Sequence, residues 1–292
     1  MDWQLLLVAA LVLYIYAAYV EPRWFRIRKR TLKTRKKLSK PIRILHLSDT
    51  HFTESNPRHK KLFSKLNTLN PDFIFITGDI IDHDAGASEA ARILGDLEMK
   101  VGTYAILGNH DYYDYEFIDN FRYHLKGIRT SKRANNAHAL KQKLEERGIH
   151  VLVNDCRQVD VNGMSVVIGG TDDPITQKVD FDRALSGMKP DSLNLLLTHI
   201  VDSVLSIKNE QKSNDLDFVF AGHTHGGQFR IPFIGGYVYG FKMAFHYVDG
   251  IHRWKNAYTC VSRGLNASRT LTHRFCCRPE VIVVDIVPDS ST

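Results

Sequence analysis

The chain has 292 residues, of which 43% are hydrophobic and 24% charged, enough for one large globular domain with smaller additions. Residues 1–40 hold ten of the 39 basic and two of the 32 acidic residues, a net charge of +8, so the rest of the chain carries −1. This near-neutral remainder argues against a nucleic acid as the main partner. The four cysteines include no CxxC pair, which argues against a zinc ribbon or disulfide scaffold and indicates a reducing compartment.

Residues 1–22 predict a transmembrane anchor, because the run from Trp3 to Val20 is apolar apart from Gln4. A helix of this length, at about 1.5 Å per residue, just spans a bilayer core of about 30 Å. Only Met1 and Asp2 precede the run, without a basic residue, which favours an anchor over a cleaved signal peptide. A helix lying on the membrane surface is the third alternative.

The basic segment 23–40 predicts a juxtamembrane linker. Under the positive-inside rule this segment stays in the cytoplasm, so we expect a single-pass protein whose large domain, residues 41–292, faces the cytoplasm. Each basic side chain near anionic headgroups contributes about 1 kcal/mol of attraction. The alternative is a topology signal without any lipid preference.

From residue 41 the pattern alternates between strands and helices. Buried strands are predicted at 42–47, 73–77 and 101–107. Helices are predicted at 58–70 and after Ser88, which is expected to be an N-cap. This order favours a mainly parallel sheet with right-handed crossovers.

The second half predicts a second sheet. A helix at 136–148, a short strand at 151–153 and a hairpin turning on Asn162-Gly163 come first. A weak helix at 181–188 and strands at 193–197 and 218–221 follow, and antiparallel strands at 257–262 and 281–287 are expected to close this sheet. The expected fold class is α/β, a four-layer αββα sandwich of two mixed sheets.

Metal-binding residue types gather where the predicted strands end. A single strand end could carry such a residue by chance. Five strand ends that all carry one, in order along the chain, argue for one site. Oxygen and imidazole donors without thiolates suit Mn²⁺, Fe or Zn²⁺, and so many donors suit two ions that share a carboxylate. The candidate ligands are Asp49, His51, Asp79, Asn109, His199, His223 and His225.

The ordered strings DTH, GDIID, GNHD, TH and GHTHGGQ between residues 42 and 286 resemble the calcineurin-like metallophosphoesterase superfamily, whose fold is the αββα sandwich. The resemblance implies two divalent ions, with Mn²⁺ the first choice. It implies that Asp49, His51 and His225 bind the first ion, that Asp79 bridges, and that Asn109, His199 and His223 bind the second. It also implies that His110 is catalytic and that Asp111 orients the His110 ring.

The strings GHTHGGQFRIPF, Ser262-Arg263-Gly264-Leu265 and Arg278-Pro279-Glu280 are similar to those of bacterial membrane-anchored phosphoesterases, among them UDP-2,3-diacylglucosamine pyrophosphatases. This resemblance implies a protein of the bacterial inner membrane that cleaves a phosphodiester or pyrophosphate bond by metal-activated water. The expected substrate is a lipid-linked phosphate, with conversion of UDP-2,3-diacylglucosamine to lipid X and UMP in lipid A synthesis the leading candidate. The alternative is a tethered phosphodiesterase or phosphatase acting on a different lipid or a soluble phosphoester. Arg263 is expected either to contact a substrate phosphate or to form a surface salt bridge.

Two aromatic segments have two interpretations each. Residues 112–138 are either a lid or lipid-facing loop beside His110 or an ordinary surface helix with its aromatic side chains in the core. Residues 229–247 are either the core of a hairpin or a patch that steers acyl chains toward the site.

Overall fold

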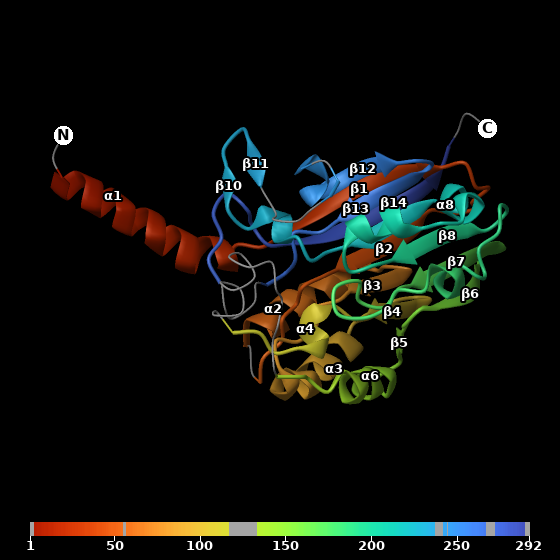
Figure 1. The fold of residues 1–292 in the computed structure, drawn as a ribbon, viewed down its shortest axis with the longest axis horizontal. Coiled ribbons are helices and arrows are strands. Elements are labelled where there is room, and N and C mark those ends of the chain that lie inside the picture. The colour runs from red at the N-terminus through yellow and green to blue at the C-terminus, as the bar shows by residue number, and fades with distance from the viewer. Residues whose placement is uncertain are drawn as a thin grey trace.

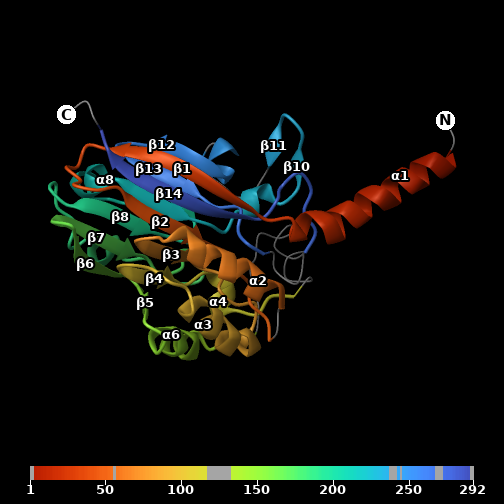
Figure 2. The ribbon, with the colours of Figure 1, turned by 180° about the vertical axis from the view of Figure 1, so that it is seen from behind.

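Two six-stranded sheets lie face to face at the centre of the computed structural model, and helices cover their outer faces (Figures 1 and 2). The structure describes residues 3–54, 57–116, 133–236, 242–243, 245–266 and 272–289. The first sheet has the strand order β1-β14-β2-β3-β4-β5. Its strands are β1 (Arg26–Thr34), β2 (Ile42–Leu47), β3 (Phe73–Thr77), β4 (Gly102–Ile106), β5 (Ile149–Val151) and β14 (Glu280–Pro288).

The second sheet has the strand order β12-β13-β9-β8-β7-β6. Its strands are β6 (Asp155–Val161), β7 (Met164–Gly170), β8 (Leu193–Leu197), β9 (Phe218–Ala221), β12 (Gly250–Trp254) and β13 (Ala257–Val261). Both sheets are mixed: β2 to β5 run parallel while β14 is antiparallel to β2, and β6 and β12 are antiparallel edges on a parallel centre. The predicted α/β sandwich of two mixed sheets is confirmed.

Three apolar layers hold the sandwich together. Between the sheets, side chains such as Phe75 and Phe220 meet edge to face at 5.1 Å between ring centroids. A second layer lies between the first sheet and its helices, and a third lies outside the second sheet. The helices on the first sheet's side are α2 (Pro57–Leu66), α3 (Ala87–Gly95), α4 (Asn109–Tyr112) and α6 (Ala137–Glu145), and those on the other side are α7 (Phe181–Ala184) and α8 (Glu210–Asp215).

Local signals in the sequence have different outcomes. Asn162 and Gly163 both have positive φ, at 54° and 82°, and form the turn between β6 and β7 as predicted. Asn136 caps α6 by accepting a hydrogen bond from the Ala139 amide at 3.0 Å. The prediction for Ser88 is wrong, because a 3-10 turn at Asp84–Gly86 runs directly into α3 and moves the start of the helix to Ala87.

The basic segment after the apolar helix is largely a strand. Arg26–Thr34 forms β1, which pairs in parallel with β14, and this corrects the predicted linker over 23–40. Two of its basic side chains are tied to the buried Glu280 carboxylate, Arg26 at 3.1 Å and Arg28 at 3.3 Å. In Figures 1 and 2, β1 runs across the sheet away from α1 (Trp3–Ile15), so its basic side chains do not all lie at the end of that helix.

The last strand belongs to the first sheet. The sequence analysis assigned residues 281–287 to the second sheet, but β14 lies between β1 and β2. β13 is antiparallel to β12, as predicted for residues 257–262, and runs parallel to its other neighbour, β9. A short buried apolar strand satisfies either sheet equally well, so the pattern alone does not select its neighbours.

The N-terminal apolar run forms a helix of the expected length. The most apolar 18-residue window of Trp3–Arg23 has a mean hydropathy of 1.9, and only 11% of that window is buried within the protein. The helix comprises α1, a π-helical turn at Tyr16–Val20 and a 3-10 turn at Glu21–Arg23. It projects from one end of the sandwich (Figure 1). By length and composition this helix can cross a membrane, as an anchor or as a signal sequence.

Candidate metal centre

Six of the seven predicted ligands come together at the carboxyl ends of β2, β3, β8 and β9, and the seventh, Asn109, follows the end of β4. Adjacent strand-end turns are joined by backbone hydrogen bonds, from the Asp49 amide to the Gly78 carbonyl at 3.1 Å and from the His51 amide to the Asp79 carbonyl at 3.0 Å. Chemistry at the carboxyl ends of strands is the usual arrangement in α/β folds. The two sheets thus supply the two halves of one site.

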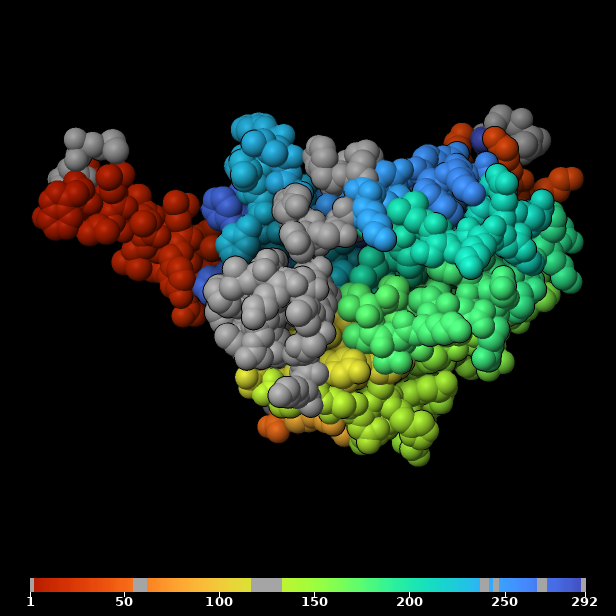
Figure 3. All heavy atoms as spheres, viewed as in Figure 1, coloured from red at the N-terminus to blue at the C-terminus, as the bar shows by residue number. Residues whose placement is uncertain are grey.

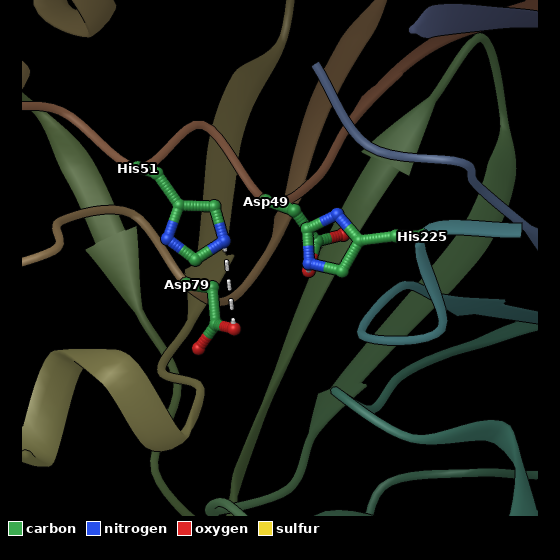
Figure 4. Close-up of side chains that lie close together, drawn as sticks. All are labelled: Asp49, His51, Asp79 and His225. Carbon is green, nitrogen blue, oxygen red and sulfur yellow. Dashed lines mark ion pairs between the residues drawn. The ribbon is translucent and has the colours of Figure 1, made fainter. Parts of the chain in front are cut away.

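Three groups of side chains each offer ligand atoms within 4.8 Å of one another, and the third consists of His51, Asp82 and His110. Asp49, His51, Asp79 and His225 form the first group, and Figure 4 shows three of these side chains converging around Asp79. Asp79, His199 and His223 form the second. Asp79 belongs to the first two groups, which is the arrangement expected of a carboxylate shared by two ions.

Five of these residues have left-handed backbone. The φ angles are 51° at Asp49, 43° at His51, 50° at Asp79, 67° at His223 and 48° at His225. Residues with a Cβ rarely adopt this conformation, which costs on the order of 1 kcal/mol or more for each residue. The fold therefore stores strain where the ligands are presented.

Neighbouring groups fix the orientation of two imidazoles. His51 Nδ1 donates to Asp82 Oδ1 at 2.9 Å, and His199 Nδ1 donates to the Thr77 carbonyl at 2.8 Å. The Nε2 atoms then face Asp79, at 3.9 Å from Oδ2 for His51 and 3.3 Å from Oδ1 for His199. Partners of this kind set the tautomer and the ring plane of metal-binding histidines.

Unpaired buried atoms show that the site fits divalent cations. Asn109 is 3% exposed, and its Oδ1 has no hydrogen-bond partner among the described residues; His51 Nε2 is likewise buried without one. A buried polar atom without a partner costs about 1–3 kcal/mol, so its retention calls for an explanation. Oxygen and imidazole donors that converge in two groups are what two divalent ions require.

Burial disfavours charge throughout the site, but neighbouring charges oppose it. Burial raises the pKa of Asp79, yet His199 and His110 outweigh this effect and hold that pKa well below its usual range. Burial lowers the pKa of His51, but Asp82 and Asp79 raise it to about 9. Burial, with His51 and Arg274 nearby, keeps the pKa of His225 well below its usual value. The bridging carboxylate is therefore ionised, and a cation must displace a proton from His51.

Asp82 is a functional residue that the sequence analysis missed. Its Oδ1 lies 2.9 Å from His51 Nδ1 and 3.3 Å from His110 Nδ1, the latter at ion-pair distance but outside hydrogen-bond geometry. Asp82 is only 2% exposed. The available signal was its place in the GDIID string, three residues after Asp79.

Asp111 does not orient His110, which corrects the role implied for it. Its carboxylate accepts hydrogen bonds from the Ile80, Ile81 and Gly108 amides at 2.8, 3.0 and 2.8 Å. These bonds tie the GNHD turn to the GDIID turn. The neighbour of the His110 ring nitrogen is Asp82 instead.

The His110 ring lies beside the first group. It meets the His51 ring edge to face at 4.8 Å and the Tyr115 ring at 4.8 Å. Its amide donates to Asp79 Oδ1 at 2.8 Å. Most of the segment predicted as a lid, residues 117–132, lies outside the described residues.

Arg263 is held by protein groups. Its Nε donates to Asp249 Oδ2 at 2.7 Å, and only 12% of its side chain is exposed. Asp249 also pairs with Arg230 at 2.6 Å. Of the two interpretations for Arg263, the geometry favours a salt bridge, and the pair is half-buried rather than on the surface.

A buried arginine links His225 to the N-terminal helix. Arg274 is fully buried, and its Nη2 lies 3.3 Å from His225 Nδ1. The Arg274 amide donates to the Ala17 carbonyl at 2.9 Å. Glu21, 1% exposed, accepts from the Cys276 amide at 2.9 Å and from the Cys277 amide. The end of the apolar helix thus packs directly behind a ligand of the metal centre.

Comparisons with known proteins agree with this site. Residues 42–227, more than half of the chain, match the model of the calcineurin-like phosphoesterase family. The chain is 28% identical to phosphodiesterase YaeI of Escherichia coli, covering 93% of this chain and 92% of that protein. It is 28% identical to the uncharacterized metallophosphoesterase YkuE of Bacillus subtilis, covering 92% and 88%. It is 26% identical to UDP-2,3-diacylglucosamine pyrophosphatase LpxG of Chlamydia muridarum, covering 77% of each chain.

Family match and geometry converge on the same residues. The family model spans the strand ends from β2 to β9, and these ends carry every member of the two candidate groups. A buried set of histidines and aspartates with one shared carboxylate is an arrangement suited to hydrolysis at phosphorus. The chain therefore belongs to the calcineurin-like phosphoesterase family and is a metal-dependent phosphoesterase.

Proposed function

We propose that this protein hydrolyses a phosphodiester or pyrophosphate bond of a lipid-linked substrate at a membrane surface. The observation that carries the proposal is the packing of the apolar helix behind His225, through Arg274 and Glu21. An anchor joined to the catalytic centre in this way holds that centre close to the bilayer. A substrate dissolved in the bilayer is then within reach, whereas a soluble substrate gains nothing from this arrangement.

The leading candidate substrate is UDP-2,3-diacylglucosamine, cleaved to lipid X and UMP. LpxG is named for this substrate, and its similarity covers 77% of the chain. With this substrate the protein would lie in the bacterial inner membrane, as a single-pass protein with residues 41–292 on the cytoplasmic face. Lipid A synthesis would then be its pathway.

We assign Asp49, His51 and His225 to one ion, Asn109, His199 and His223 to the other, and Asp79 to both. Two bound divalent ions, with Mn²⁺ the first choice and Fe or Zn²⁺ the alternatives, supply an activated water and neutralise charge on the phosphate. The protein's own residues orient these donors through Asp82 and the Thr77 carbonyl.

We assign to His110 the transfer of a proton to the oxygen of the leaving group. Its Nδ1 faces Asp82, which leaves Nε2 as the ring nitrogen available for proton transfer. With 12% of its side chain exposed, the ring lies at the border of the buried centre, where a substrate can reach it. Proton transfer by a positioned histidine contributes about 10²- to 10⁴-fold to the rate.

The second candidate function is a membrane-tethered phosphodiesterase for a different lipid or a soluble phosphoester. The similarity to phosphodiesterase YaeI favours it, because it covers 93% of the chain, more than the similarity to LpxG. The fold and the metal centre serve both functions equally. The two candidates differ only in the group that carries the phosphate.

The test is UMP release from UDP-2,3-diacylglucosamine by the full chain, purified in detergent and loaded with Mn²⁺. His110→Ala is the control for chemistry, and its metal content shows whether the centre is intact. UMP release that the variant lacks supports the first candidate. Cleavage of bis(4-nitrophenyl) phosphate that depends on His110, without UMP release, selects the second.

A further inference from the structure

A short hairpin beside the metal centre exposes apolar side chains. Residues 229–236, which we call the apolar hairpin, follow His225–Gly227 and contain β10 (Arg230–Ile231) and β11 (Gly235–Gly236). The exposed fractions are 47% for Phe229, 62% for Ile231, 108% for Phe233 and 67% for Ile234. For residues 229–236 the hairpin-core interpretation is therefore wrong, and Tyr237, Tyr239 and Phe241 lie outside the described residues. The turn itself, from Ile231 to Gly236, carries no charged residue.

The hairpin stands away from the body of the protein. A hollow of about 510 Å³ lies behind it, bordered on the far side by Asp249, His252 and Cys276. The hairpin's own pairing is limited to two residues on each strand. Its apolar side chains are thus at most partly covered by the described residues, and Phe233 is fully exposed.

The hairpin and the N-terminal helix are braced on the same segment, residues 272–277. On one side, Phe275 forms a β-bridge with Phe229, and the Arg230 amide donates to the Phe275 carbonyl at 2.9 Å. On the other side, the Phe275 ring meets the Tyr16 ring edge to face at 6.4 Å. Figures 1 and 2 show both elements at the same end of the sandwich, with the hairpin beside the end of the helix. Figure 3 shows the hairpin protruding from that end.

The boundary of a bilayer can be located on the helix. Trp24 is 53% exposed, and the Arg278 guanidinium stacks on its ring at 3.9 Å. Arg23 donates to the Tyr19 carbonyl at 2.7 Å. Tryptophan and arginine at the end of an apolar helix mark the level of lipid headgroups. The apolar hairpin lies beside this level.

We propose that the apolar hairpin inserts into the membrane next to the N-terminal helix and is a second membrane contact of the protein. This inference rests on the membrane association in the proposed function. A helix alone leaves the domain free to rotate about the helix axis, whereas two contacts fix which face meets the lipid. Because the hairpin directly follows His225, the face that is fixed carries the metal centre.

A bilayer is the occupant that the surroundings favour. The exposed apolar residues lie at the same end of the sandwich as a helix long enough to span a membrane, and the tip contains aromatic and aliphatic side chains without charge. Loops of this composition insert at the boundary between headgroups and acyl chains. A second copy of this chain is the competing occupant, and the experiment separates the two.

The test uses the full chain in lipid nanodiscs, with the photoreactive residue benzoylphenylalanine placed at position 233. The matched control places it at Val101, which is 38% exposed at the amino end of β4, away from the strand ends that carry the site. Lipid adducts at 233 and none at 101, detected by mass spectrometry, are expected. Adducts only to another copy of the protein, or no adducts at 233, would overturn the proposal.

A second measurement separates this proposal from the proposed function. Phe233→Glu is expected to lower kcat/KM for the lipid-linked substrate in vesicles about tenfold, because it places a charge in the interface. It should leave kcat/KM for bis(4-nitrophenyl) phosphate unchanged, as should Val101→Glu for both substrates. An equal loss for both substrates would contradict the inference. Absence of lipid hydrolysis in the unmodified protein would refute the proposed function, while the adducts at 233 still report membrane contact.

Discussion

Replacing Asp82 by Asn tests how the centre orients its histidines. The Asp82 carboxylate contacts two imidazoles, because its Oδ1 lies 2.9 Å from His51 Nδ1 and 3.3 Å from His110 Nδ1. Both rings face the same oxygen, Oδ1, and an amide of the same shape carries no charge, so it holds the two rings more weakly. The substitution should therefore weaken the ion that binds through His51 and should also slow the chemistry assigned to His110.

The expected size follows from the partners of each histidine. Loss of a carboxylate that orients a ligating histidine reduces metal affinity by about 10- to 100-fold. His199 is oriented by the Thr77 carbonyl, which the substitution does not touch. The second ion, in the group Asp79, His199 and His223, shares only Asp79 with the first group, so its affinity should fall less than that of the first ion.

Calorimetric titration of the metal-free full chain with Mn²⁺, in detergent, resolves the two affinities. Asp84→Asn is the matched control, because Asp84 lies two residues away, is exposed, and bonds only the Asn136 amide among the contacts described for it. A larger loss of affinity for the first ion than for the second is the expected result. Equal weakening of both ions, or none, would refute the assignment of Asp82 to the first group.

Three further predictions concern stability and close packing. Burial lowers the pKa of His46 to about 3, so the unfolded state gains the proton first, and stability should fall as the pH drops below about 6.5, by about 2 kcal/mol at pH 5. His46→Gln should remove this part of the pH dependence in urea denaturation, and an unchanged pH profile would show that the histidine is not the cause. Glu21→Gln should lower the free energy of unfolding by about 1.5–3 kcal/mol, because two hydrogen bonds to its buried carboxylate lose their charge. An unshifted urea midpoint would mean that these bonds to Glu21 do not hold the end of the helix against the protein. Gly222→Ala should abolish metal binding in the same titration, because its Cβ would lie 2.5 Å from Asp49 Oδ2, whereas Gly163→Ala, which meets nothing within 4 Å, should cost only about 1 kcal/mol of backbone strain.

The candidate ligands could be predicted because strand ends are visible in the sequence. Asp49, Asp79 and His199 each follow a short apolar run by one or two residues, and parallel strands bring such ends to one edge. What each carboxylate touches is not visible in this way. Asp82 and Asp111 both occupy motif positions, and only the folded turns show that the first faces two histidines and the second three amides.

The strand neighbours could not be predicted for the ends of the chain. β1 has only Ile27 and Leu32 as apolar residues, so its composition indicates a solvated segment, and its strand form depends on pairing with β14. β14 is a buried apolar strand that fits either sheet by pattern. Pairing between residues so distant in sequence is decided by the whole fold and leaves no local signal.

The pairing of β1 with β14 sets an order for synthesis. Arg26 of β1 lies opposite Glu280 of β14. β1 is synthesised before the other strands, but it can pair only after β14 has been synthesised. Until then the apolar helix can already reside in the membrane while the first sheet stays open between β1 and β2. A chain cut short before residue 280 lacks β14 and the hydrogen bond from the Glu280 amide to the Gly264 carbonyl. Gly264 precedes Leu265, whose amide donates to the Ser48 carbonyl beside the metal centre. A chain that ends before residue 280 therefore lacks the strand that joins β1 to β2, and its first sheet stays unfinished.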